Sequence, residues 1–185
     1  EAYKLSEIEL RKHDKNFLGT KTIENAWCPS LNNIQILDIL NKISKRISRE
    51  YKVDIRIGLD VAANSLWNGR RYQYKKFARL MQKRALNEEM QIKYIQRLIE
   101  NYELVYVEDP LNEENFEGFK ELNKGACLIS GDDLIATNIE RLIQAVKEKS
   151  ISAVIIKPNQ IGSLLKTKEV VDFAKKNKIV PVISH

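Results

Sequence analysis

The chain has 185 residues, of which 43% are hydrophobic and 30% charged, a composition typical of a globular protein with a substantial core. No apolar run reaches the roughly 20 residues of a membrane span, and the charged N-terminus lacks the apolar core of a signal peptide. The net charge of +6 comes from lysines interspersed with glutamates, which favours a solvated surface over a nucleic-acid site. Cys28 and Cys127 form no zinc motif or disulfide framework, so we expect a reducing, cytoplasmic setting.

The first fifty residues show the weakest pattern. Residues 1–20 are polar and have no strong period, so no particular element is assigned there within an irregular and helical lead-in over 1–50. Residues 33–48 carry isoleucine and leucine at helical spacing, which predicts a helix. A strand is expected next at 53–59, where apolar and polar residues alternate up to Asp60. A long helical region follows, and residues 88–100 have helical spacing.

Short apolar segments alternate with helical segments through the rest of the chain. In chain order we expect a strand at 104–108, a helix at 113–122, a strand at 126–132, a helix at 138–149, a strand at 153–157, a helix at 161–176 and a strand at 179–184. Thr137 and Glu140 match a capping box at the start of one helix. Such alternation is typical of successive βα units, so we expect an α/β fold with a parallel sheet over 51–185 and a lead-in over 1–50.

Charged residues stand at the ends of the predicted strands. Asp60, Glu108, Asp132 and Lys157 each end a β-like segment, and His185 ends the last one. Glu108 and Asp132 are 24 residues apart, and Asp132 and Lys157 are 25 apart, about one βα unit each. Because neighbouring parallel strands end at one edge of a sheet, we expect these side chains to share a pocket.

The residue types in this pocket favour metal-assisted proton transfer. Asp60, Glu108 and Asp132 would supply the oxygen ligands that Mg²⁺ prefers. Burial and metal charge lower the pKa of a lysine such as Lys157 toward general-base duty, while nearby carboxylates act in the opposite direction. The alternatives are that each acid caps a helix or pairs with a surface lysine, and that Lys157 only pairs with Asp132 or Glu108. The reaction favoured is proton abstraction next to a carboxylate.

The segments around these residues resemble enolase, the phosphopyruvate hydratase of glycolysis. The similar segments, which run in the family's order, are LDVAANSLW, VEDPLNEENFEGF, SGDDLIATN, IIKPNQIGSL and VISH. The resemblance covers residues 24–185. It implies a partial (β/α)8-type barrel, 2-phosphoglycerate and phosphoenolpyruvate as the substrate pair, and a homodimer in the complete protein.

The resemblance also implies a role for individual residues. Asp60, Glu108 and Asp132 match the ligands of the tightly bound Mg²⁺. Lys157 matches the base that removes the C2 proton, and so also binds substrate. His185 matches a histidine that contacts the substrate in the closed state.

One segment departs from the family pattern. The family's GDEGGFAP aligns with Thr22–Pro29, TIENAWCP, so Glu24 falls on the glutamate that helps to expel the C3 hydroxyl. Ile23 replaces the preceding aspartate and the flexible glycines are missing, which would stiffen the loop. The N-terminal capping domain, a second catalytic glutamate and the arginine and serine after the histidine are absent from these 185 residues.

Several alternatives stay open on this basis. The chain is a fragment of an enolase, one piece of a split protein, or a module reused for binding. By function it is the metal-binding part of a hydro-lyase that is inactive in isolation, or a catalytically inactive binding or structural protein. Nucleic-acid binding is the weakest of these hypotheses.

Overall fold

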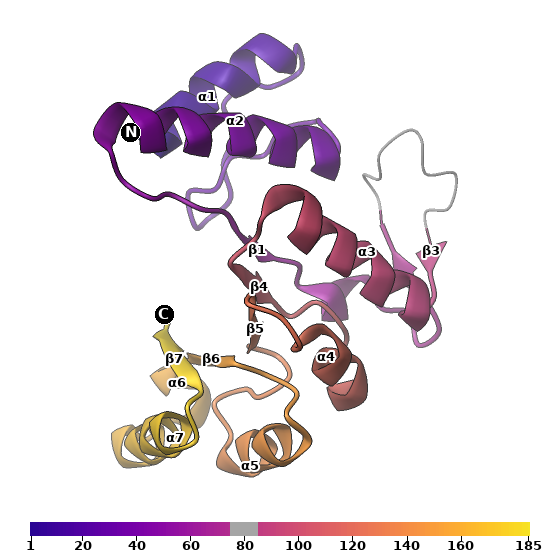
Figure 1. Cartoon of the computed structure of the whole chain (residues 1–185), viewed down its shortest axis with the longest axis vertical. Coiled ribbons are helices and arrows are strands. Elements are labelled where there is room, and N and C mark those ends of the chain that lie inside the picture. Colours follow the sequence, from indigo (N-terminus) through magenta and orange to yellow (C-terminus); the bar gives the residue numbers. More distant parts are fainter. Residues whose placement is uncertain (75–84) are drawn as a thin grey trace. The chain divides into compact units, whose positions relative to one another are not determined.

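The computed structural model describes residues 1–74 and 85–185 (Figure 1). Contacts within the chain divide it into two compact units. The described part of the first is Glu1–Ile57 with Tyr74, and the second is Gly58–Gln73 with Ala85–His185. Within the described ranges, no helix is both long and apolar enough to cross a membrane.

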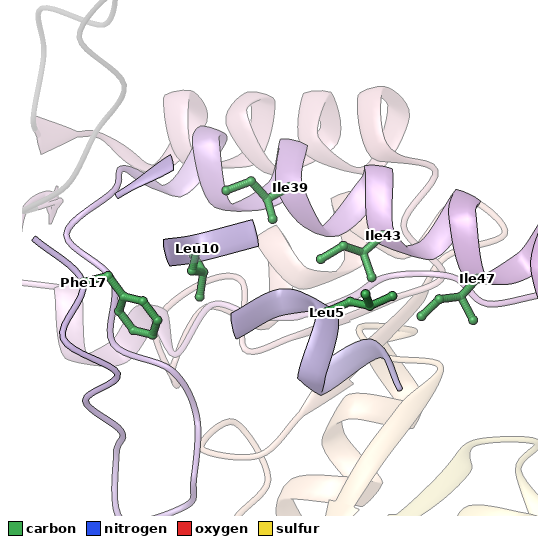
Figure 2. Close-up of a cluster of buried hydrophobic side chains, with 6 residues drawn as sticks. All are labelled: Leu5, Leu10, Phe17, Ile39, Ile43 and Ile47. Carbon is green, nitrogen blue, oxygen red and sulfur yellow. The ribbon is translucent and has the colours of Figure 1, made fainter. Parts of the chain in front are cut away.

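The first unit is built on two helices, α1 (Ala2–His13) and α2 (Asn33–Tyr51). Asn32 and Gln35 form a reciprocal capping box at the start of α2, which satisfies two backbone donors that the helix itself leaves free. The two helices and the segment that joins them bury a common cluster of apolar side chains, shown in Figure 2. Its members are Leu5, Leu10, Phe17, Ile39, Ile43 and Ile47.

Helix α1 was not expected, because residues 1–20 have no continuous apolar stripe. Its apolar face is narrow, with Leu5 and Leu10 as its only buried hydrophobic residues. A short helix of this kind is marginal in isolation and gains most of its stability from tertiary packing. Packing against α2 therefore accounts for a helix that the local pattern does not predict.

Residues 21–27 of the same unit form a closed turn. The Thr22 amide donates to the Ala26 carbonyl at 2.8 Å, and Lys21 and Trp27 are joined by an isolated bridge. The Trp27 ring stacks on Tyr3 with a centroid distance of 4.8 Å, and the Lys21 amine lies 4.3 Å from its centroid. This turn holds the segment that aligns with the family's glycine-rich loop.

The second unit contains a five-stranded parallel sheet, in which strands are neighbours in the order β1-β4-β5-β6-β7. The strands are β1 (Gly58–Asp60), β4 (Tyr106–Glu108), β5 (Leu128–Gly131), β6 (Ala153–Ile156) and β7 (Val180–Ile183). Strand order therefore follows chain order, as in a barrel made of successive βα units. A short antiparallel pair, β2 (Tyr72–Gln73) with β3 (Ala85–Leu86), and the 3-10 helix η1 (Ala63–Leu66) precede α3.

Helices follow the strands of this sheet. They are α3 (Glu88–Tyr102), α4 (Phe116–Leu122), α5 (Ile139–Glu148), α6 (Pro158–Ile161) and α7 (Leu164–Lys176). Helix α3 contacts α4, α4 contacts α5, and α5 contacts α7, so the helices pack side by side in chain order (Figure 1). Val107, Ile129 and Val154 from three adjacent strands are fully buried in the core. The expected α/β fold, a partial (β/α)8-type barrel, is confirmed.

Some predicted boundaries are wrong. The strand expected at 53–59 is confined to Gly58–Asp60, which pairs with the three residues of β4. An alternating pattern alone does not form a strand where no neighbouring strand accepts its hydrogen bonds. The helix expected at 161–176 begins three residues later, as α7, because Gly162 ends the preceding short helix α6 in the left-handed conformation and Ser163 caps α7.

The capping box predicted at Thr137 and Glu140 is not observed, and the N-cap lies one residue later. The N-cap of α5 is Asn138, whose side chain accepts hydrogen bonds from the amides of Glu140 and Arg141. The Thr137 hydroxyl instead contacts Lys157 and Gln160, which follow the next strand. A tertiary contact therefore replaces the local one that the spacing indicated.

Candidate functional site

The predicted acids meet at the carboxyl ends of adjacent strands. Asp60 at the end of β1 stands directly opposite Glu108 at the end of β4. The Asp60 carboxylate accepts a hydrogen bond from the Ala62 amide at 3.0 Å. Burial raises the pKa of Asp60, and the negative charges of Asp132 and Asp133 raise that pKa further. The acids of different strands are thus close enough to destabilise one another's ionised form.

Glu108 is held by a neighbour on its own strand. The Tyr106 hydroxyl donates to Glu108 Oε2 at 2.6 Å, because residues two apart on a strand share a face. Burial raises the pKa of Glu108; the Tyr106 hydrogen bond lowers it, and the charges of Asp60 and Asp132 raise it. Burial and the Glu108 carboxylate raise the pKa of the Tyr106 phenol, so it stays protonated and remains a donor.

Lys157 and Asp132 form an ion pair across the ends of two neighbouring strands. Lys157 Nζ lies 2.5 Å from Asp132 Oδ2, with side chains that are only 18% and 13% exposed. The hydrogen bond to Asp132 raises the pKa of Lys157 more than burial lowers it. The lowering that burial alone would produce is therefore outweighed by the Asp132 carboxylate in this arrangement.

The carboxylates have the donor chemistry that a hard divalent cation requires. Asp132 Oδ1 is buried and has no hydrogen-bond partner within the described residues, although Oδ2 is engaged by Lys157. A buried carboxylate oxygen without a hydrogen-bond partner, beside two further acids, is energetically unfavourable unless a cation binds there. The residue types therefore fit a divalent cation. Within the described ranges, no three His, Cys, Asp or Glu side chains are already arranged so that they could hold a metal ion.

The two remaining predicted residues belong to different units. His185 is exposed and follows β7, and the adjacent Ser184 amide donates to the Ile156 carbonyl at 3.0 Å. That bond holds the end of β7 beside the end of β6, where Lys157 begins. Glu24 belongs to the first unit and lies exposed within the closed turn at 21–27. The roles of both residues stay predictions.

Asp109 is a further site residue that the pattern of strand ends did not reveal. Its side chain is buried, and its two oxygens accept the amides of Asp132 at 2.9 Å and Asp133 at 2.7 Å. Burial raises its pKa to about 7. The carboxyl group thus holds the backbone after β5 against the end of β4. The only sequence signal was a second acid directly after Glu108.

The sheet is parallel and of the α/β barrel type, and it carries three acids and a lysine at its carboxyl edge. Proteins of this class have their functional residues at the carboxyl ends of the strands. The family model described as the enolase C-terminal TIM barrel domain matches residues 6–185. The chain belongs to this family.

Curated relatives named enolase agree with this assignment. The chain is 41% identical to the enolase of Methanosphaera stadtmanae over 180 residues, which are 96% of the chain and 43% of that protein. It is 42% identical to the enolase of Pyrobaculum aerophilum over 176 residues, 94% of the chain and 41% of that protein. For the enolase of Archaeoglobus fulgidus the identity is 39% over 173 residues, 93% of the chain and 42% of that protein. The chain spans less than half the length of these relatives.

Proposed function

We propose that the protein carrying this chain is a Mg²⁺-dependent hydro-lyase that interconverts 2-phosphoglycerate and phosphoenolpyruvate. The observation that carries the proposal is the Lys157–Asp132 ion pair at the edge of a sheet that also presents Asp60 and Glu108. Family membership supports it, since the relatives are named enolase. Glycolysis, a cytoplasmic location and a homodimer follow from the same membership and belong to the proposal.

Each residue has a distinct part in the proposed reaction. Asp60, Glu108 and Asp132 would hold Mg²⁺, which would stabilise the negative charge that develops on the substrate carboxylate. Once its amine has lost its own proton, Lys157 would accept the C2 proton, the C2–H electron pair would form the double bond, and the C3 hydroxyl would leave as water after it is protonated. Glu24 is the candidate donor of that proton, and His185 is a candidate substrate contact.

Replacing Lys157 with alanine tests the base. Lys157→Ala should lower kcat by about 10²- to 10⁴-fold, the usual contribution of a positioned general base. Phosphoenolpyruvate formation by the protein as its gene encodes it gives the rate, and C2 proton exchange in D₂O isolates the abstraction step. Lys168→Ala is the matched control, because that lysine is exposed on α7 and pairs with Asp172 on the same helix. Full turnover by Lys157→Ala would reject the assignment.

A catalytically inactive binding or structural protein is the second candidate function. The closed turn at 21–27 favours it, because Asn25 and Ala26 stand where the family has flexible glycines, and the adjacent Trp27 is stacked on Tyr3. It predicts a folded protein that forms no phosphoenolpyruvate at saturating Mg²⁺ and 2-phosphoglycerate. Robust turnover by the wild-type protein would reject it.

The organisation of residues 1–185 as one incomplete barrel domain, inactive when isolated, also stays a prediction.

A further inference from the structure

Thr137 makes contacts that link two parts of the candidate site. It lies between β5 and α5, and none of its surface is exposed. Its hydroxyl accepts a hydrogen bond from the Lys157 amide at 2.9 Å and donates one to Gln160 Oε1 at 2.7 Å. A single buried hydroxyl therefore joins the residue proposed as the base to the short helix α6 that follows it.

The backbone at Thr137 is held in an unfavourable conformation. Ala136 and Thr137 have φ values of 50° and 52°, in the left-handed region that β-branched residues rarely adopt. Such conformations persist only where surrounding contacts enforce them, and they concentrate at functional sites. The turn is closed at its start by the Asp132 carbonyl, which accepts the Ala136 amide at 2.7 Å.

The turn from Asp132 to Thr137 thus holds Lys157 both by its side chain and by its backbone. Asp132, which begins the turn, binds the side-chain amine, and Thr137, which ends it, binds the backbone amide. Strand β6 ends at Ile156, so the Thr137 hydroxyl takes the place of a ladder hydrogen bond for Lys157. Pro158 restricts the backbone of Lys157 from the other side. These contacts leave the lysine little freedom to change direction.

We infer that Thr137 is a positioning residue, whose hydroxyl fixes the backbone of Lys157 so that its amine is aimed at the reacting carbon. This rests on the proposed function, because it assigns Thr137 to the same proton transfer. The residue does not touch the substrate. It acts through Lys157, and small errors in aim are costly in a step that requires an aligned approach.

Paired substitutions separate this role from simple structural support. Thr137→Val keeps the shape and removes the hydroxyl; we expect kcat to fall about 10- to 100-fold while KM for 2-phosphoglycerate changes little. Thr137→Ser should recover most of the loss. Thr167→Val is the matched control, because Thr167 is also buried and its hydroxyl donates to the carbonyl of Ser163, the N-cap of α7. It should lower Tm without lowering kcat.

A second measurement is independent of turnover. With a limiting amount of an amine-acylating reagent, mass spectrometry compares modification of Lys157 with that of exposed Lys168. Thr137→Val should raise the relative modification of Lys157 several-fold, and Thr137→Ser should not. If Thr137→Val does not fold, Gln160→Leu, which removes the acceptor of the hydroxyl proton, should give a smaller change in the same direction.

The outcomes distinguish this inference from the proposed function. An inactive wild-type protein rejects the function, and the acylation measurement then decides whether Thr137 still orders Lys157. If the wild-type protein is active, the positioning role is overturned when Thr137→Val changes neither kcat nor the acylation of Lys157. If Thr137→Val does not fold, the same result in Gln160→Leu overturns it. Equal losses of kcat in Thr137→Val and Thr167→Val overturn it too, because both would then report general destabilisation.

Discussion

Asp14 is a single carboxylate that ties two segments of the first unit together. It follows α1 and accepts hydrogen bonds from the Ser30 hydroxyl at 2.6 Å and the Ser30 amide at 2.5 Å. The Ser30 hydroxyl hydrogen bond lowers the pKa of Asp14, so the ionised form is bound more tightly in the folded state. The stabilisation is present above the unfolded pKa of about 3.9 and is lost as the pH falls through the lower folded value.

Asp14→Asn should therefore lower the free energy of unfolding at pH 7, and the difference from wild type should shrink below pH 4. Urea denaturation at a series of pH values measures both effects. Glu117→Gln is a suitable control, because that carboxylate is 80% exposed and has only a loose pairing with Lys120. A difference from wild type that stays constant with pH would contradict the role given to ionised Asp14.

At the scale of single residues, the sequence predicts the charged residues of the site better than the residues that hold the backbone around them. The position of Asp132 and Lys157 at successive strand ends was enough to predict that they meet. Asp109 was missed and Thr137 was given the wrong role because each binds a backbone amide more than 19 residues away in sequence. No local period encodes such a contact, so it emerges only from the assembled sheet.

At the scale of elements, helix α5 offers a direct test of the corrected cap. Asn138→Ala removes the acceptor for the amides of Glu140 and Arg141, and should lower the free energy of unfolding by about 1 kcal/mol. Asn138→Asp keeps a capping oxygen and should lose much less. Chemical denaturation provides the measurement. Equal losses in both variants would show that the amide of Asn138 has a different role.

The accuracy of the predicted elements depended on how they are stabilised. Helix α3 and the strand pairs after residue 104 follow strong local periods, and they were found close to their observed bounds. Helix α1 depends on packing against α2, and residues 53–57 alternate without a partner strand in the described sheet. The local pattern therefore failed where a second segment decides the outcome.

At the scale of the whole molecule, β7 is an edge of the described sheet and carries exposed apolar side chains. Ile183 is 68% exposed, and Leu165 at the start of α7 is 82% exposed. An apolar edge strand favours association between chains, and a lysine on the edge opposes it. We expect the 185-residue chain to self-associate with rising concentration, and Ile183→Lys to reduce this.

Sedimentation velocity over a concentration series measures the effect. Ile143→Lys is the matched control, since Ile143 is an exposed isoleucine on helix α5 and leaves the sheet edge unchanged. An equal reduction by both variants would point to net charge rather than the strand edge. The parallel α/β sheet was predictable from repeated βα spacing, which is visible along the chain, whereas the partial barrel was implied by the resemblance to enolase.

The strand order also sets the sequence of events by which the site is assembled during folding. Glu108, Asp132 and Lys157 are joined through connections of about equal length, whereas Asp60 lies 48 residues before its partner Glu108. Closing a loop twice as long costs about 0.6 kcal/mol more in chain entropy. Strands β4 to β7 can therefore pair while β1 is still detached. From this entropy difference we expect Asp60, which precedes the other two site acids in the chain, to join them last, after Lys157 is already beside Asp132.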